Sequence, residues 1–219
     1  MKLFSPLKMC YTKEASISSF IVGFVSSLLL IFYGDPEYKY QNIAIGVSFI
    51  FASLMQLIDY MIYLDPKCKN GWNEIAGKIG PILNILQPLV IYIFILFFVE
   101  DDTLKIIASG WNILYLIYIF YIYAQYFKIG NFCSSQENGR AKWIWYKYFG
   151  GTWQTVYLLV LYLNLIMLWE YKYFRVYTFL ITLFFLISYM NYKNHTGEFW
   201  CWFVNSAPLI ILILQKLNF

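Results

Sequence analysis

Apolar residues in this chain form long, nearly unbroken runs and do not alternate with polar ones. A transmembrane helix needs about 20 such residues, because each residue rises 1.5 Å and the hydrocarbon core of a bilayer is about 30 Å thick. Strands of a membrane barrel would be about ten residues long and would alternate polar with apolar positions. Seven runs meet the helical requirement, and they span residues 15–33, 42–64, 74–98, 103–127, 151–169, 174–192 and 199–217. The pattern therefore predicts an all-α, polytopic membrane helix bundle with seven transmembrane helices.

The composition supports the same class of protein. Of the 219 residues, 61% are hydrophobic and 13% are charged, whereas a soluble domain is about 45–50% apolar and about 25% charged. So little charge cannot cover a water-facing surface. The chain also lacks the polar bulk of a disordered protein and the cysteine density of a disulfide-rich secreted one. Because the seven runs leave little other sequence, we expect residues 1–219 to form a single, integral, multi-pass membrane domain.

Lysine and arginine residues are distributed unevenly between the two expected membrane faces. One face holds the N-terminal segment and the loops after the second, fourth and sixth runs, and it carries eleven of the 16 basic residues: Lys2, Lys8, Lys13, Lys67, Lys69, Lys78, Lys128, Arg140, Lys142, Lys147 and Lys193. Basic loops tend to stay in the cytoplasm, so we expect the N-terminus inside and the C-terminus outside. The net charge of +4 indicates membrane lipids as partners and no nucleic acid, because no basic face lies clear of the membrane.

Asp59 is the most informative polar residue, because an ionisable side chain inside an apolar helix is expensive and often functional. It lies about five residues, or roughly 8 Å, from the basic-face end of the second run, and Gln56 lies one turn earlier on the same helical face. The third run begins at the same membrane face, and Lys78 lies about one turn into it. We therefore expect Asp59 and Lys78 to pair, because each would otherwise be an uncompensated charge at low dielectric constant.

Amide side chains lie at comparable depth in other runs, namely Asn84, Gln87, Gln154 and Asn205. Two of these stretches lead into Pro88 and Pro208, and each proline frees a backbone carbonyl that a nearby amide can satisfy. If all these faces converge on Asp59, they line a polar cavity that opens toward the cytoplasm, as in transporters with proline-broken helices. The alternative is that they are only hydrogen-bonding contacts between helices, each contributing about 0.6–2 kcal/mol.

Soft metal-ligand residues gather at the basic face: Cys10, Cys68, Cys133, Cys201 and His195. Cys10, Cys201 and His195 could hold zinc, but no pair has the C-x-x-C or H-x-x-x-H spacing of a metal motif, so we expect no metal and no other cofactor. The thiols stay reduced if this face is cytoplasmic, whereas one or two disulfides form if it is lumenal. A glycosylation sequon at residues 194–196 adjoins two helix ends, and we attribute it to chance.

Motifs of common enzyme classes are absent from the sequence. It contains no G-x-S-x-G elbow, no H-E-x-x-H pair and no glycine-rich phosphate loop, and one histidine cannot build a multi-histidine site. We interpret the polar insert at residues 128–148 as a solvated turn followed by an interfacial segment at Trp143 and Trp145, because indole prefers the headgroup layer.

Several short motifs carry a resemblance to a known family. Met9-Cys10 and then Ala15-Ser16 stand at the head of the first run. A Gln-x-x-acid pair follows in the second run and a Trp-Cys-Trp opening begins the last one, at residues 200–202. Together they resemble an uncharacterised family of small multi-pass proteins found in giant DNA viruses and microbes.

This resemblance implies a location in a host or viral membrane, but it implies no activity. The acid of the pair is Asp59, where the family is expected to have glutamate, and the charge is kept. The resemblance also implies that Cys10, Gln56, Asp59 and Cys201 belong to one constellation.

Three functions are consistent with this pattern. The first is binding or transport of a small molecule, ion or lipid through a polar cavity around Asp59, Gln56, Lys78, Asn84, Gln87, Gln154 and Asn205. The second is a membrane-embedded, lipid-modifying enzyme that uses Asp59 with Cys10, Cys201 or His195. The third is a structural or assembly protein without a ligand. We favour the first, because intramembrane ionisable groups commonly mark a pathway or site.

Overall fold

The computed structural model describes residues 12–137, 140–149, 151–191 and 196–218, and the prediction of an all-α protein is confirmed. The elements are α1 (Lys13–Tyr33), the 3-10 turn η2 (Pro36–Tyr38), α2 (Lys39–Leu64), α3 (Trp72–Phe98), α4 (Asp102–Phe127), β1 (Ser135–Glu137), β2 (Arg140–Lys142), α5 (Ile144–Phe149), α6 (Thr152–Met167), α7 (Lys172–Asn191), α8 (Thr196–Val204) and α9 (Ala207–Lys216).

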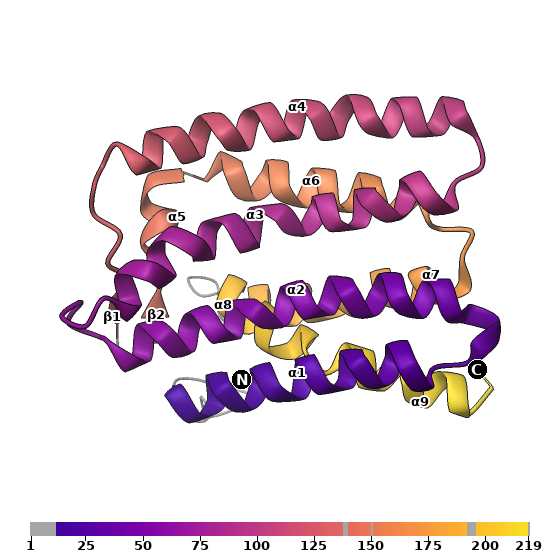
Figure 1. Cartoon of the computed structure of the whole chain (residues 1–219), viewed down its shortest axis with the longest axis horizontal. Coiled ribbons are helices and arrows are strands. Elements are labelled where there is room, and N and C mark those ends of the chain that lie inside the picture. Colours follow the sequence, from indigo (N-terminus) through magenta and orange to yellow (C-terminus); the bar gives the residue numbers. More distant parts are fainter. Residues whose placement is uncertain (1–11, 138–139, 150, 192–195, 219) are drawn as a thin grey trace.

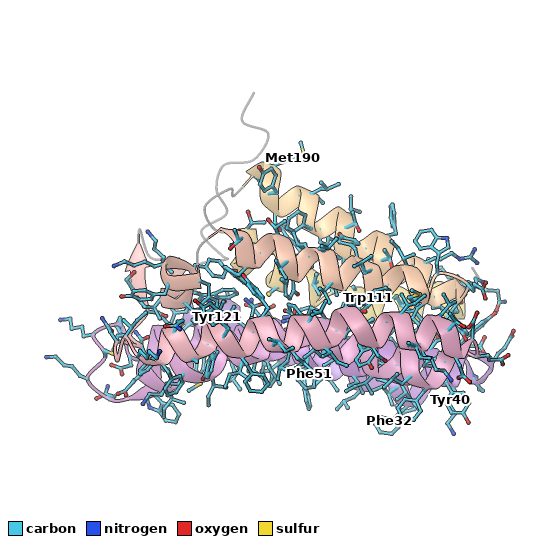
Figure 2. All side chains as sticks on the ribbon, turned by 90° about the horizontal axis from the view of Figure 1, so that it is seen from above. Phe32, Tyr40, Phe51, Trp111, Tyr121 and Met190 are labelled. Atoms are coloured by element: carbon cyan, nitrogen blue, oxygen red, sulfur yellow. A yellow bond between two sulfur atoms is a disulfide. The ribbon has the colours of Figure 1, made fainter. Side chains whose placement is uncertain are left out.

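The long helices lie side by side in two layers. Helices α1, α2, α3 and α4 form one layer in chain order, each packed against the next (Figure 1). Helices α6, α7 and the α8–α9 pair form the second layer, which is seen edge-on in the view from above (Figure 2). α6 packs against α3 and α4, whereas α7 and α8 pack against α2, and α9 packs against α1. Short loops between consecutive helices produce this up-and-down arrangement.

Within the described residues, five segments are long and apolar enough to cross a membrane: Lys13–Tyr33, Pro36–Leu64, Trp72–Phe98, Asp102–Phe127 and Lys172–Asn191. Seven crossings were predicted. The two predicted runs that are missing from the five are shorter in the structure, because α6 has 16 residues and the last predicted run divides into α8 and α9. The division falls at Asn205 and Ser206, and Pro208 stands in the first turn of α9, where its missing N–H is tolerated.

Proline acts differently in α3, which stays helical through both Pro81 and Pro88. The carbonyl one turn before Pro81 belongs to Gly77, and it accepts a hydrogen bond from the Tyr126 hydroxyl at 2.9 Å. The freed carbonyl therefore finds a hydroxyl donor from α4, and the helix is not interrupted.

Large apolar side chains cover much of the outer surface. Phe32, Phe97, Phe120 and Met190 are all more than two-thirds exposed, and Phe32 and Met190 project from opposite layers in Figure 2. The interior contains aromatic and aliphatic residues together with buried serines and asparagines. An apolar outside and a partly polar inside suit a bundle whose surroundings are lipid.

The polar insert after α4 is packed into the protein. Strands β1 and β2 pair antiparallel, with Ser135 opposite Lys142, and the chain then turns inward. Trp143 and Trp145 are only 1% and 0% exposed, and their rings stack at 5.0 Å. The prediction of interfacial tryptophans was therefore wrong, whereas Ser135 and Gln136 in the turn are exposed, as predicted. Helix α3 provides a notch for the tryptophan segment at Gly80, where a Cβ would lie 2.6 Å from the Trp145 ring.

Candidate functional site

Asp59 is buried beside the insert. Its Oδ1 accepts a hydrogen bond from the indole Nε1 of Trp143 at 2.5 Å, and its Oδ2 accepts one from Nε2 of Gln56 at 3.5 Å. Only 4% of Asp59 is exposed. The helical spacing of Gln56 and Asp59 was visible in the sequence, but the indole donor comes from 84 residues further along the chain.

Lys78 does not pair with Asp59, and that prediction was wrong. Its ammonium group lies 2.6 Å from Oε1 of Glu74, one turn earlier in α3, and 5.2 Å from the centre of the Phe132 ring. Both partners in the Lys78–Glu74 pair are well exposed. Lys78 therefore has a local partner at the helix surface, while Trp143 occupies the position beside the Asp59 carboxylate.

A cavity of about 260 Å³ lies between the two layers, near the end of the bundle that carries the β-hairpin. It is bounded by α3, the Trp143–α5 segment, α6, α7 and α8. Its lining residues are Asn84, Trp143, Tyr146, Trp153, Gln154, Thr155, Tyr157, Leu158, Phe185, Tyr189, Thr196, Trp200 and Cys201. Seven of these thirteen side chains are aromatic.

Hydrogen bonds hold several cavity walls in place. Trp143 donates to Asp59, Trp200 Nε1 donates to the Ile181 carbonyl at 3.0 Å, and the Tyr157 hydroxyl donates to Oε1 of Gln87 at 2.7 Å. The rings of Trp153 and Tyr157 also lie 6.1 Å apart. Walls fixed in this way form a cavity before any ligand arrives.

Two of the lining residues present buried N–H groups without an acceptor. Nδ2 of Asn84 and Nε1 of Trp153 make no hydrogen bond to any part of the protein that the structure describes. An unsatisfied buried donor destabilises a fold by about 1–3 kcal/mol. Both groups belong to residues that line the cavity, but the two nitrogen atoms themselves lie beneath its surface.

A smaller cavity of about 20 Å³ lies one helical turn further along α6, between Leu161 and Ile181. It shares Tyr157, Trp200 and Cys201 with the larger cavity, and it also borders Gln87. The Nε2 of Gln87 is a further buried donor without a partner among the described residues.

The structure brings only some of the predicted site residues together. Asn84 and Gln154 line the larger cavity, and Gln87 lines the smaller one. Asp59 and Gln56 reach the larger cavity only through Trp143. Asn205 donates instead to the Ser19 hydroxyl at 2.8 Å, between α1 and the α8–α9 break. Lys78 and Asn205 line neither cavity.

Sequence reasoning missed the aromatic residues that form most of the wall. Trp143 was assigned to an interfacial segment, and Trp153, Tyr157 and Trp200 were counted only as members of apolar runs. One sequence signal could have indicated a site here. Trp153 and Tyr157 lie one turn apart on the same side of a helix, and each carries a polar group on its ring.

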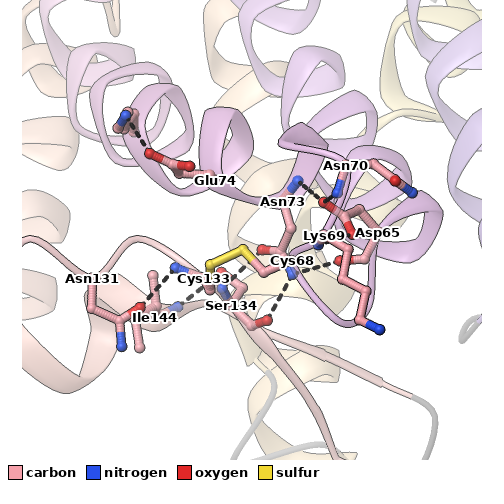
Figure 3. Close-up of a disulfide and its surroundings, with 11 residues drawn as sticks. Asp65, Cys68, Lys69, Asn70, Asn73, Glu74, Asn131, Cys133, Ser134 and Ile144 are labelled. Atoms are coloured by element: carbon pink, nitrogen blue, oxygen red, sulfur yellow. Dashed lines mark hydrogen bonds and ion pairs between the residues drawn. A yellow bond between two sulfur atoms is a disulfide. The ribbon is translucent and has the colours of Figure 1, made fainter.

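A disulfide fastens the insert to the loop between α2 and α3. Cys68 and Cys133 are bonded, with their Cα atoms 6.0 Å apart, and Figure 3 shows the polar groups around them. Asn73 Nδ2 donates to the Ser134 carbonyl at 2.8 Å, and Ser134 N donates back to Asn73 Oδ1 at the same distance. We call this arrangement of the 65–73 loop and residues 131–134 the clasp.

Asp65 organises the loop side of the clasp. Desolvation raises the pKa of the Asp65 carboxyl, but the backbone N–H groups of Lys69, Asn70 and Asn73 that donate to the carboxylate outweigh this, and the net pKa lies below its usual value. The donor distances for Lys69 and Asn70 are 2.7 and 3.0 Å. The charged form is therefore the one that the folded loop prefers.

The zinc hypothesis gains no support. Cys10 and His195 lie outside the described residues, and Cys201 is buried in the cavity wall. Within the described ranges, no group of three or more His, Cys, Asp or Glu residues is arranged to hold a metal ion.

Comparison with protein-family models, with curated proteins and with solved structures finds no match for this chain. The resemblance to the viral multi-pass family stays a prediction.

Proposed function

We propose that this is a multi-pass membrane protein that binds a small molecule in the aromatic cavity. Five helices are long and apolar enough to cross a membrane. We propose that α6 and the α8–α9 pair cross as well, because they lie alongside these helices in the second layer (Figure 1). That arrangement gives seven crossings in total, with the cavity between the two layers.

The observation that supports ligand binding is the cavity itself, whose walls are mainly aromatic and also carry the amide and hydroxyl groups of Asn84, Gln154 and Thr155. Concave sites with mainly apolar walls and a few convergent polar groups are typical of small-molecule binding. The volume of about 260 Å³ lies near the lower end of the range for such sites.

A pair of substitutions in α6 tests this proposal. Leu158→Trp places a larger ring in the cavity, whereas Leu159→Trp places the same ring on the outer surface, because Leu158 lines the cavity and Leu159 is 57% exposed. We expect native mass spectrometry of the protein released from mild detergent to show a bound small molecule. The bound mass should be lost in Leu158→Trp and kept in Leu159→Trp. Identical spectra for the two variants would contradict the proposal.

A structural role without ligand is the second candidate, and the state of Asp59 favours it. Its carboxylate is buried and hydrogen-bonded to Trp143 and Gln56, as expected for a group that locks the insert onto α2. The absence of any bound mass in the unmodified protein would support this candidate over the first.

We further propose that the hairpin end of the bundle faces an oxidising compartment. The distribution of lysine and arginine assigns this end to the cytoplasm, but it also carries the Cys68–Cys133 disulfide. Cytosolic thiols are kept reduced in most cells. We give the disulfide more weight, because it depends directly on the redox state of its compartment, whereas the charge bias is a statistical tendency.

A further inference from the structure

We propose that the aromatic cavity binds a quaternary ammonium group against its rings. This inference rests on the proposed function and specifies the class of ligand that the cavity takes. Two sources share this chemistry: the trimethylammonium headgroup of a phosphatidylcholine lipid and a free choline-like solute.

The rings of the cavity wall contact one another in an unbroken series. It contains six of the seven aromatic lining residues, in the order Trp143, Tyr146, Trp153, Tyr157, Trp200 and Phe185. Neighbouring ring centres lie 5.1–6.1 Å apart, and four of the five pairs meet at angles of 61–82°. Rings that meet at steep angles surround a rounded space, which suits a tetrahedral group better than a flat one.

A slot for a flat ligand is not formed by the seventh ring. Tyr189 lies nearly parallel to Phe185, with an angle of 15° between the rings and 6.2 Å between their centres. A ring stacked between two others needs about 7 Å, because carbon atoms in contact are about 3.5 Å apart. The shape of the wall therefore favours a globular ligand group.

The polar ends of these rings are turned into the protein. The N–H of Trp143 donates to the Asp59 carboxylate, and the N–H of Trp200 donates to a backbone carbonyl of α7. The hydroxyl of Tyr157 donates to a side-chain amide of α3, and the nitrogen of Trp153 lies beneath the cavity surface. The wall therefore presents mainly ring carbon and π electrons to a ligand.

The charge of the wall favours a cation over an anion or a neutral group. The faces of aromatic rings carry a negative potential that attracts cations. None of the thirteen described lining side chains is Lys or Arg, so none of these repels a positive ligand. The hydrogen bond from Trp143 to a carboxylate also pushes electron density into its indole ring.

Among cations, a quaternary ammonium group matches this wall best. A primary ammonium group carries three N–H donors that need acceptors, and ring surfaces supply few of them. A quaternary ammonium group has no N–H donor, and aromatic cages are a known means of recognising it.

The cavity is accessible near the ends of two helices. Thr155 of α6 and Tyr189 of α7 both line it and are both exposed. Thr155 is three residues from the start of α6 and Tyr189 two residues from the end of α7, which places both within about 5 Å of the helix ends. In the proposed membrane arrangement, this opening lies at the level of lipid headgroups, where choline groups and water-soluble cations are both present.

The test uses the full chain in nanodiscs of phosphatidylethanolamine and phosphatidylglycerol, so that the membrane itself supplies no quaternary ammonium group. The probes are choline, its uncharged isostere 3,3-dimethyl-1-butanol, and ethanolamine as a primary ammonium. We expect choline to raise the unfolding temperature in a saturable manner, and the isostere and ethanolamine to have no such effect.

A lipid arm distinguishes the two sources. Dihexanoylphosphatidylcholine and dihexanoylphosphatidylethanolamine are added below their micellar concentrations, and we expect only the first to raise the unfolding temperature. Saturation by dihexanoylphosphatidylcholine at a lower concentration than by choline indicates a lipid headgroup. The reverse order indicates a free solute.

Variants connect the response to the rings. Trp153→Leu and Phe185→Leu each replace a ring by an apolar side chain without π electrons. The affinity for choline, taken from the concentration dependence of the shift, should fall by about five- to thirtyfold in each. Trp153→Phe keeps a ring and should lose less. Trp169→Leu is the matched control and should leave the affinity unchanged, because Trp169 is 51% exposed and lies beyond the opposite end of α6.

Several results would overturn the inference. These are no saturable response to choline or dihexanoylphosphatidylcholine, an equal response to the isostere or to ethanolamine, or unchanged affinity in both leucine variants of the wall. If Leu158→Trp loses a co-purified mass while neither choline probe binds, the ligand class is wrong and the proposed function remains. If Leu158→Trp and Leu159→Trp give the same spectra and no probe binds, both proposals fail.

Discussion

At the scale of single residues, the interior of this protein is organised by polar side chains with partners far away in the sequence. Asn164 accepts at Oδ1 from Trp111 and Asn112 and donates through Nδ2 to the Pro88 carbonyl, so one amide joins α3, α4 and α6. Asp59 has the same role between α2 and the insert. Such contacts are buried, so each missing partner would leave a polar group unsatisfied.

The hydrogen bond between Trp143 and Asp59 can be isolated by a matched pair of substitutions. Trp143→Phe removes the N–H that donates to the carboxylate, whereas Trp145→Phe removes an equally buried N–H that has no acceptor among the described residues. We expect Trp143→Phe to lower the free energy of unfolding by about 1.5–3 kcal/mol more than Trp145→Phe, because its acceptor is a buried carboxylate. Thermal unfolding in detergent measures the difference. Equal losses would show that the indole contributes only its ring.

At the scale of elements, α3 is shaped to receive the insert. A Cβ at Gly77 would overlap the carbonyl oxygen of Phe132, and one at Gly80 would press on the Trp145 ring. Glycine usually weakens a helix by about 0.5–1 kcal/mol relative to alanine. In α3 the absence of a side chain is what lets the insert approach.

The close approach at Gly77 predicts opposite effects for the same substitution in two helices. Gly77→Ala should destabilise the protein by about 1–3 kcal/mol, because the backbone of Phe132 must move. Gly110→Ala in α4 meets no atom within 4 Å, so it should leave stability unchanged or raise it by up to about 1 kcal/mol. Thermal unfolding of both variants provides the comparison, and a stabilised Gly77→Ala would refute the close contact.

The clasp should loosen in acid. Because the pKa of Asp65 is lower in the folded loop than in an unfolded chain, the carboxylate stabilises the clasp above its usual pKa of about 3.9. This contribution is lost as the pH falls through the lowered value. Hydrogen exchange at the Lys69 and Asn70 amides, corrected for intrinsic rates, should therefore accelerate below about pH 4. Asp65→Asn should abolish the pH step, and a step that persists in this variant would assign it to another group.

At the scale of the whole molecule, the polar and irregular features described above lie together at one end of the two layers. The hairpin lies where α2 ends and α3 begins (Figure 1). The clasp and the cavity lie at the same end, since Cys68 follows α2 and the cavity is lined by Trp143, Trp153 and Thr155. The short loop between α3 and α4 and the turn between α6 and α7 lie at the opposite end. In the proposed membrane arrangement, the compartment that the hairpin end faces decides whether an oxidant can reach the Cys68–Cys133 pair.

Cysteine labelling in sealed microsomes tests the proposed orientation. Gln136→Cys places an exposed thiol in β1 at the hairpin end, and Glu170→Cys places one between α6 and α7 at the other end. With a membrane-impermeant maleimide, we expect Glu170→Cys to react at once and Gln136→Cys to react only after detergent, both measured against the unmodified chain. The reverse pattern would restore the orientation indicated by the lysine and arginine distribution.

The sequence alone determined the class of the protein and several local relations. Long apolar runs determined the helices, because few other backbone structures can bury or embed that much apolar surface. The i, i+3 spacing placed Gln56 beside Asp59. Asn84 and Gln154, two of the predicted site residues, line the aromatic cavity, and their role in ligand binding stays a prediction.

Only the tertiary structure decided which distant segments meet. It set Trp143 against Asp59, left Lys78 with Glu74, and joined Cys68 to Cys133 across 65 residues. It also divided the last run at Asn205, where the side chain turns to Ser19. These contacts depend on how an irregular insert folds back over a helix with glycines at the right positions, and no period in the sequence encodes that.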